Sequence, residues 1–168
     1  MRKALLVLAL LFTVSATQAQ YNEQVARADY AQAFTGRLNN FVWSRQCLTD
    51  KDKNTLIALI AQRIQITAIV DNIIIGVIED WTPGIFASMA YGRLPWDGST
   101  IKAGVTYMLS DSGYIVTASR IYYLNEALDK SYSPVYSIIY NKYGELRQRG
   151  DEDLQYFDNA FCDKLLIE

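Results

Sequence analysis

The chemistry open to this chain is limited first by a residue type that it lacks, because none of its 168 residues is a histidine. Nucleophilic catalysis by a Ser-His-Asp or Cys-His set is thereby excluded, and so is hydrolysis at a histidine-bound metal. Carboxylates, lysine, tyrosine or a bound cofactor remain. The sequence contains no P-loop, dinucleotide fingerprint or calcium loop. We therefore expect a protein that is not an enzyme and needs no cofactor or metal.

Acidic residues are the remaining candidates for catalysis, since paired carboxylates hydrolyse glycosides. The candidates are Glu79-Asp80, Asp97, Asp111 and the cluster 151–153. Asp97 and Asp111 fall in predicted turns, where aspartate is common. The cluster opens a predicted helix, whose dipole favours negative charge. Structural roles therefore explain these carboxylates more simply than catalysis does.

The two cysteines, Cys47 and Cys162, are 115 positions apart. In an exported chain an even count of two most simply indicates one disulfide. The chain-entropy model gives such a bridge about 5 kcal/mol of stabilisation. A redox motif of the Cys-x-x-Cys type is absent, and two cysteines without histidine do not form an ordinary zinc site. Two separately buried thiols are the alternative.

Tyrosines are the residues that point toward a binding function, since ten of the twelve lie after position 90. Tyrosine supplies contact area and a hydroxyl at little entropic cost. We predict a protein-contact face that carries Tyr122, Tyr123, Tyr136 and Tyr140. Neighbours on a strand point to opposite faces, so the first two cannot both lie in the core. Tyrosine also suits half-buried strands, and a small-ligand pocket is a further alternative.

The elements that would position these residues centre on Leu56–Trp81, the longest apolar run after the N-terminal segment. Its apolar residues recur at three- and four-residue steps, which predicts a long buried helix. Thr49 with Asp52 would cap its start, and Pro83-Gly84 would end it near Asp80.

This run has two other interpretations. Ile64, Ile66, Ala68 and Val70 also alternate, as in a pair of strands joined at Asp71-Asn72. A membrane span is disfavoured because Arg63 and Asp71 are costly in a bilayer. These two charges form a second candidate site, either a partly exposed stripe or a buried acid that meets an arginine elsewhere or on a partner.

The remaining segments complete an α+β fold: N-terminal helices including a long buried central helix, then antiparallel β-hairpins and a C-terminal helix. The sequence predicts, in order, a helix over 21–43, a loop over 44–50, an irregular connector over 82–99, a hairpin of 101–109 with 114–124, a helical turn or loop over 125–130, a hairpin of 135–140 with 145–149, and a helix over 151–166.

The N-terminal segment, residues 1–19, has the pattern of a secretory signal peptide. Arg2 and Lys3 precede an apolar stretch, and Thr17-Gln18-Ala19 is a small-x-Ala cleavage site. A retained anchor helix is the alternative, although the apolar stretch is short for a span. We expect one domain, 20–168, in the periplasm or secreted. Its formal charge of 14 minus 18, or −4, argues against nucleic acid or an anionic membrane as partner.

These features together are similar in type to small bacterial periplasmic inhibitors, including immunity proteins that neutralise toxins. We therefore expect an exported, non-enzymatic binding protein that acts by protein contact. One alternative is an accessory subunit of an envelope assembly, such as a pilus, secretion or sensor complex. The other is a carrier of a small apolar ligand, held between the sheet and the central helix.

Overall fold

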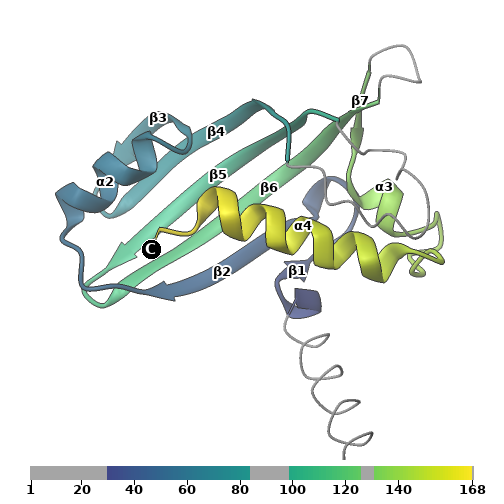
Figure 1. The fold of residues 1–168 in the computed structure, drawn as a ribbon, viewed down its shortest axis with the longest axis horizontal. Coiled ribbons are helices and arrows are strands. Elements are labelled where there is room, and N and C mark those ends of the chain that lie inside the picture. Colours follow the sequence, from purple (N-terminus) through teal and green to yellow (C-terminus); the bar gives the residue numbers. More distant parts are fainter. Residues whose placement is uncertain (1–29, 84–98, 126–130, 168) are drawn as a thin grey trace, which may run out of the picture.

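The computed structural model describes residues 30–83, 99–125 and 131–167. They form an antiparallel sheet of seven strands and a few helices (Figure 1). The elements in chain order are β1 (Phe34–Thr35), the 3-10 helix η1 (Leu38–Asn40), β2 (Val42–Leu48), α2 (Lys53–Ala61), β3 (Gln65–Val70), β4 (Ile73–Trp81), β5 (Ile101–Ser110), β6 (Gly113–Asn125), β7 (Ser131–Pro134), α3 (Tyr136–Ile139) and α4 (Gly150–Leu165).

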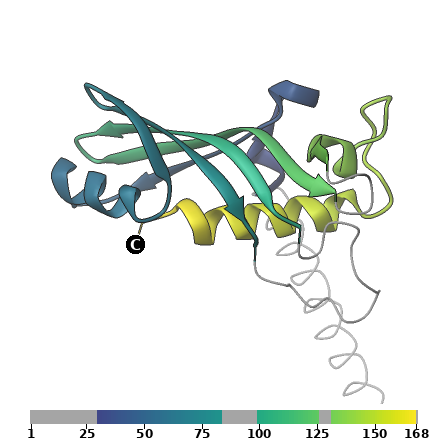
Figure 2. The same ribbon diagram turned by 90° about the horizontal axis from the view of Figure 1, so that it is seen from above.

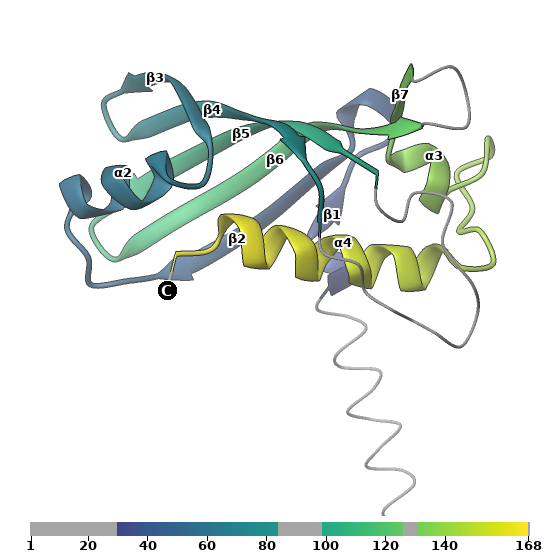
Figure 3. The ribbon, with the colours of Figure 1, turned by 45° about the horizontal axis from the view of Figure 1, so that its top comes forward.

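The strands lie in the order β1-β2-β6-β5-β4-β3, and β7 pairs with the second half of β6. Seen from above, α2 and α4 lie on the same side of the sheet (Figure 2). The chain end after α4 lies near α2 and the β5–β6 turn (Figure 3). The sheet therefore has one face packed against helices and a second face that α2 and α4 leave uncovered.

The β5–β6 hairpin, predicted from alternation, is confirmed. Residues of β5 at odd positions are buried from Ile101 to Leu109, and those at even positions are half-buried or exposed. Asp111 and Ser112 form the turn between the strands. A strand with one buried and one solvated face alternates in this way because successive side chains point to opposite sides.

The prediction of a long central helix is wrong. Only Lys53–Ala61 of that region is helical, with Asp52 rather than Thr49 as its N-cap. Residues 65–81 instead form β3 and β4, joined at Asp71-Asn72. Ten of the fifteen residues at 64–78 are β-branched, which favours strands over helix. Asp71 adopts the left-handed conformation that this turn needs, with φ 51°.

Two further elements differ from the expectation. Of the predicted helix over 21–43, residues 30–32 are helical in the described part, but from Phe34 onward β1, η1 and β2 replace the rest of this helix and the predicted loop over 44–50. The predicted hairpin of 135–149 is instead α3 followed by an isolated bridge between Tyr140 and Leu146. The segments 84–98 and 126–130, and the signal-like residues 1–19, lie outside the described residues.

The C-terminal helix α4 is confirmed, and it covers the inner face of the sheet. Its face of Leu154, Phe157, Phe161 and Leu165 is buried. Phe161 stacks on the buried Trp43 of β2, with ring centroids 5.3 Å apart. No helix of the described residues is long and apolar enough to cross a membrane.

Candidate functional site

The uncovered face of the sheet is built from alternate residues of five strands. Because each strand presents every second side chain to this side, the pairing registers define three rows that run across the sheet. We call these fifteen positions the uncharged face. The rows are Val70-Ile73-Met108-Ile115-Gln46, Ala68-Ile75-Thr106-Thr117-Ser44 and Gln65-Val77-Gly104-Ser119-Val42.

None of these fifteen positions carries a charged residue. Charged residues make up 20% of the chain, so about three would stand here at average composition. Large apolar side chains are exposed instead: Val70 at 55%, Met108 at 51%, Ile75 at 41% and Ile115 at 40%. Their clustering on one uncovered face is typical of a surface that binds another protein.

Hydroxyl residues fill the middle of the uncharged face. Ser44 and Thr117 share a hydrogen bond of 3.2 Å across β2 and β6. Ser44 also donates from Oγ to the carbonyl oxygen of Val116, at 3.1 Å. With Gly104 and Ala68 nearby in the rows, this region has few protruding side chains. A flat partner surface could approach it closely.

Charged residues lie next to one end of the uncharged face. Lys102 and Glu79 form a salt bridge of 3.2 Å, and the Lys102 ammonium lies 5.8 Å from the ring centre of Tyr132. The Tyr132 hydroxyl donates to Asp80 at 3.4 Å. Protein–protein interfaces usually have a polar rim of this kind.

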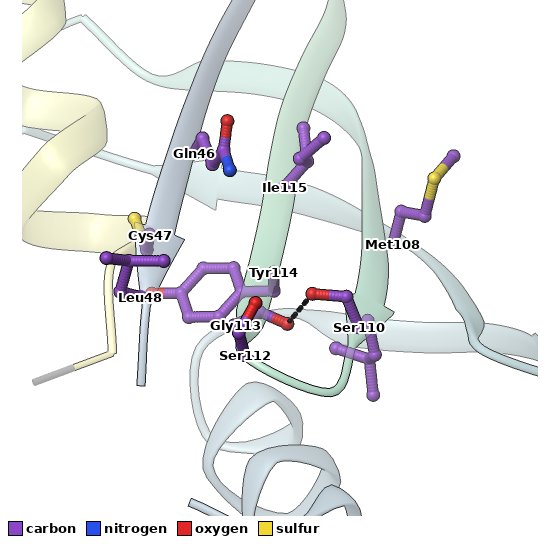
Figure 4. Close-up of a pocket in the computed structure, with 10 residues that line it drawn as sticks. Gln46, Cys47, Leu48, Met108, Ser110, Ser112, Gly113, Tyr114 and Ile115 are labelled. Atoms are coloured by element: carbon purple, nitrogen blue, oxygen red, sulfur yellow. Dashed lines mark hydrogen bonds between the residues drawn. The ribbon is translucent and has the colours of Figure 1, made fainter. Parts of the chain in front are cut away.

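A pocket of about 240 Å³ lies at the opposite end, around the β5–β6 turn. Figure 4 shows Gln46, Ile115 and Met108, from three neighbouring strands, along its wall. Ser110 donates from Oγ to the carbonyl oxygen of Gly113 at 3.1 Å, which closes the turn below them. The pocket is smaller than the 300–1,000 Å³ typical of small-molecule sites. It suits a single side chain of a partner, and we call it the tip pocket.

A second hollow, of about 200 Å³, lies where α2 ends beside the last turn of α4. Its lining includes Arg63, Lys164 and Glu79. Arg63 donates from Nη1 to the carbonyl oxygens of Asp163 and Lys164, at 2.9 and 3.2 Å. These are among the carbonyls that a helix end leaves without partners. We call this hollow the basic pocket.

The carboxylate of Asp158 on α4 is buried at the inner face and tightly bound there. Trp43 donates from Nε1 to Asp158 Oδ1 at 2.7 Å. Arg45 donates from Nε to Oδ1 at 3.1 Å and from Nη2 to Oδ2 at 2.6 Å. This bidentate arrangement fixes α4 on β2, which is a structural role rather than a catalytic one.

The two cysteines lie on elements that pack together. Cys47 follows Arg45 on the inner face of β2, and Cys162 lies one helical turn after Asp158 on α4. Both thiols are free and half-buried. Burial, with the negative charge of Asp158, raises the pKa of Cys162 to about 11. Such a thiol is a poor nucleophile at neutral pH.

The four tyrosines of the predicted contact face are placed in different environments. Tyr122 is half-buried on the uncovered side of β6, opposite Lys102, whereas Tyr123 is buried on the inner side. Tyr136 is buried on α3 and stacks on the half-buried Tyr140, with centroids 4.7 Å apart. The structure therefore brings Tyr136 and Tyr140 together and places the other two on opposite faces of the sheet.

Two more tyrosines have structural roles that explain part of the tyrosine enrichment. The Tyr107 hydroxyl donates to the carbonyl oxygen of Leu165 at 2.7 Å, and the Tyr114 hydroxyl accepts from the Ile167 N–H at 2.7 Å. Together they hold the end of α4 and the residues after it. Burial raises the pKa of both tyrosines, to about 12 for Tyr114.

The structure places Arg63 and Asp71, the two residues of the second predicted site, apart from each other. Asp71 is exposed in the β3–β4 turn, where Lys53 donates to its carbonyl oxygen at 2.7 Å, and Arg63 lies at the end of α4. Among the described residues no group of three potential metal ligands is found. The uncharged face was missed from sequence, although the lack of charge at even positions of 104–108 was a visible signal.

No protein-family model matches this chain, and no curated protein matches it either. Among solved structures, it is similar to a DUF4468 family protein from Bacteroides ovatus ATCC 8483. The two are 16% identical, with 78% of this chain and 82% of the other covered and a TM-score of 0.48.

Proposed function

We propose that this chain is an exported, non-enzymatic protein that binds a partner protein through the uncharged face. The observation that carries the proposal is an uncovered sheet face of fifteen positions without a charge, on which four large apolar side chains are exposed. An inhibitor or immunity protein acts in this way, by covering a surface of its target. The proposal that the chain is exported rests on the signal-like segment 1–19.

The partner that fits has a flat apolar surface and one protruding apolar side chain. The flat part would lie on the hydroxyl-lined middle of the face, and the side chain would enter the tip pocket, whose walls include Leu48, Met108 and Ile115. Anchors of this kind carry most of the binding energy in protein interfaces. The tyrosines contribute where they reach the surface, which favours Tyr122 over Tyr123.

The structure favours a surface binder over an internal ligand carrier. A carrier would need a cavity between the sheet and its covering helix. In that position Trp43, Phe157 and Phe161 are fully buried, and two of these rings stack. Packing of this density is that of a protein core.

The experiment places a photo-crosslinking amino acid at Met108 and, separately, at Leu146 in the exported chain. Leu146 is a matched control because it is also exposed, at 45%, but lies in the segment between α3 and α4. We expect a discrete crosslinked protein from Met108 and none from Leu146. A soluble enzyme or toxin as product would indicate an inhibitor, and pilus, secretion or sensor components would indicate the accessory subunit.

A second arm measures the affinity for the identified partner. Met108→Lys with Ile115→Lys places two charges on the face, which we expect to weaken binding by about 10-fold or more because both must be desolvated. Leu146→Lys should leave the affinity unchanged. Surface changes of this kind alter stability little, which thermal unfolding would verify. If the double variant bound as tightly as the native chain, the uncharged face would not be the contact.

A further inference from the structure

The basic pocket brings two cations from distant parts of the chain together. Arg63 follows α2, and Lys164 belongs to the last turn of α4. They lie close enough for the positive charge of Arg63 to lower the pKa of Lys164, in addition to the larger effect of burial. The hollow that both line has a volume of about 200 Å³.

Neither cation is neutralised by a carboxylate in the part of the chain that the structure describes. The salt bridges there join Arg45 to Asp158, Arg149 to Glu152 and Lys102 to Glu79. Glu79 lines the pocket, but its partner at 3.2 Å is Lys102. The other lining side chains are uncharged: Ala61, Gln62, Ile64, Gln65, Val77 and Ile78.

Helix capping accounts for only part of this arrangement. A cation near the end of a helix is favourable, and Arg63 fills that role through Nη1. Its Nε and Nη2 groups make no hydrogen bond within the described residues. Lys164 also makes none there, and its charge is repelled by Arg63. Three donor groups with two positive charges therefore line one hollow in a chain of net negative charge.

We propose that Arg63 and Lys164 bind the oxyanion group of a small ligand, a carboxylate or a phosphate. The two free donors of a guanidinium match two oxygens of such a group, and an ammonium adds a third contact. The volume is below that of drug-sized sites, which fits a small anion. The pocket shares Gln65 and Val77 with the edge of the uncharged face, but Arg63 and Lys164 do not belong to that face. Changes to these two cations therefore test anion binding, whereas changes to Met108 and Ile115 test the protein contact.

The test is a nuclear magnetic resonance titration of the mature chain, residues 20–168, with sodium phosphate and separately with sodium acetate. Ionic strength is held constant with sodium chloride. We expect saturable shifts with millimolar dissociation constants, confined to the amides of 62–65 and 163–166 and the Lys164 side chain. Tighter binding of acetate would assign a carboxylate ligand, and tighter binding of phosphate would assign a phosphate.

Variants separate this site from general charge effects. Lys164→Gln removes one cation without breaking a hydrogen bond, and we expect about 5-fold weaker binding. Lys142→Gln is the control, because Lys142 belongs to the segment between α3 and α4, and this segment leads into the start of α4, whereas Lys164 lies in its last turn. Glu79→Gln removes the pocket's own carboxylate and should tighten binding about 2-fold. Arg63 is left in place because it also caps α4.

Several outcomes would overturn the proposal. Shifts that rise linearly up to about 100 mM of both anions would show that no site exists. Equal weakening by Lys164→Gln and Lys142→Gln would show an effect of net charge alone. Unchanged affinity in Lys164→Gln would remove Lys164 from the site.

Discussion

A disulfide between Cys47 and Cys162 is expected when the chain folds in an oxidising compartment, although both thiols are free in the structure. The packing of β2 on α4 brings the two together. Arg45 on β2 binds Asp158 on α4. Cys47 lies two residues further along the strand, roughly 6.6 Å, and Cys162 lies four residues further along the helix, roughly 6 Å.

A second contact shows that β2 and α4 run in the same direction. Tyr114, which pairs with Cys47 across β2 and β6, accepts a hydrogen bond from the Ile167 N–H beyond α4. The two thiols also interact electrostatically, since Cys47 contributes to the raised pKa of Cys162. Closing the bond therefore requires a local adjustment of the two side chains rather than a change of fold.

The size of the effect follows from the separation of the two cysteines, which are 115 positions apart. The chain-entropy model gives about 4.8 kcal/mol at 298 K, less any strain in the folded state. For a domain of this length, that corresponds to a rise in melting temperature of roughly 15 °C. Such a bridge would account for a large share of a total stability of about 5 to 15 kcal/mol.

The assay uses the mature chain purified from an oxidising compartment without reductant. Denaturation in the presence of a maleimide should modify no cysteine before reduction and two afterwards, as read by mass. Thermal unfolding should shift downward on reduction. A Cys47→Ser, Cys162→Ser double variant should melt like the reduced chain and be insensitive to reductant. Two maleimide adducts without reduction, or a double variant that melts within about 2 °C of the oxidised chain, would refute the reasoning.

Two further predictions concern stability. Asp158→Ala should destabilise the domain by about 3 kcal/mol in urea unfolding, because it leaves the Arg45 charge without its partner. Asp163→Ala, on the exposed side of the same helix, is the control, and equal effects of the two changes would contradict the structural role of Asp158. At high pH, the raised pKa values of Cys162 and Tyr114 keep these groups protonated longer in the folded than in the unfolded state. In the reduced chain, the stability that they contribute should be present below pH 9 and lost as the pH rises through 11 to 12, and a midpoint independent of pH over this range would contradict it.

The part of the fold that sequence predicts well is the part whose pattern is local. The β5–β6 hairpin has strict alternation and a Ser110–Gly113 turn, and α4 has apolar residues at helical steps. For the β3–β4 hairpin the apolar residues fit both the helical and the strand period, so only weaker signals distinguish the two. Gly76, which the helix prediction leaves out of account, is unfavourable within a helix. In the sheet a Cβ at this position would lie 2.5 Å from the Gln65 carbonyl oxygen.

Strand β2 was missed because its stability comes from residues far away in the sequence. Its inward positions are Trp43, Arg45 and Cys47, which do not form an apolar stripe. Arg45 is tolerated on the inner side only because Asp158, 113 positions later, accepts two hydrogen bonds from it. The uncharged face was missed for a related reason, because its cross-strand rows can be identified only when the pairing registers of five strands are known.

The composition of the uncharged face is better explained by binding than by folding. An antiparallel sheet with one solvated face normally carries polar residues outward, and exposed apolar rows carry a risk of self-association. The inner face already provides the core, from Trp43 to Phe161, so stability does not require Met108 or Ile115 to be apolar. The chain elsewhere has charges available, since Lys102 and Glu79 stand in the next row. A surface that keeps a costly composition over fifteen adjacent positions is one that we expect to be covered when the protein acts.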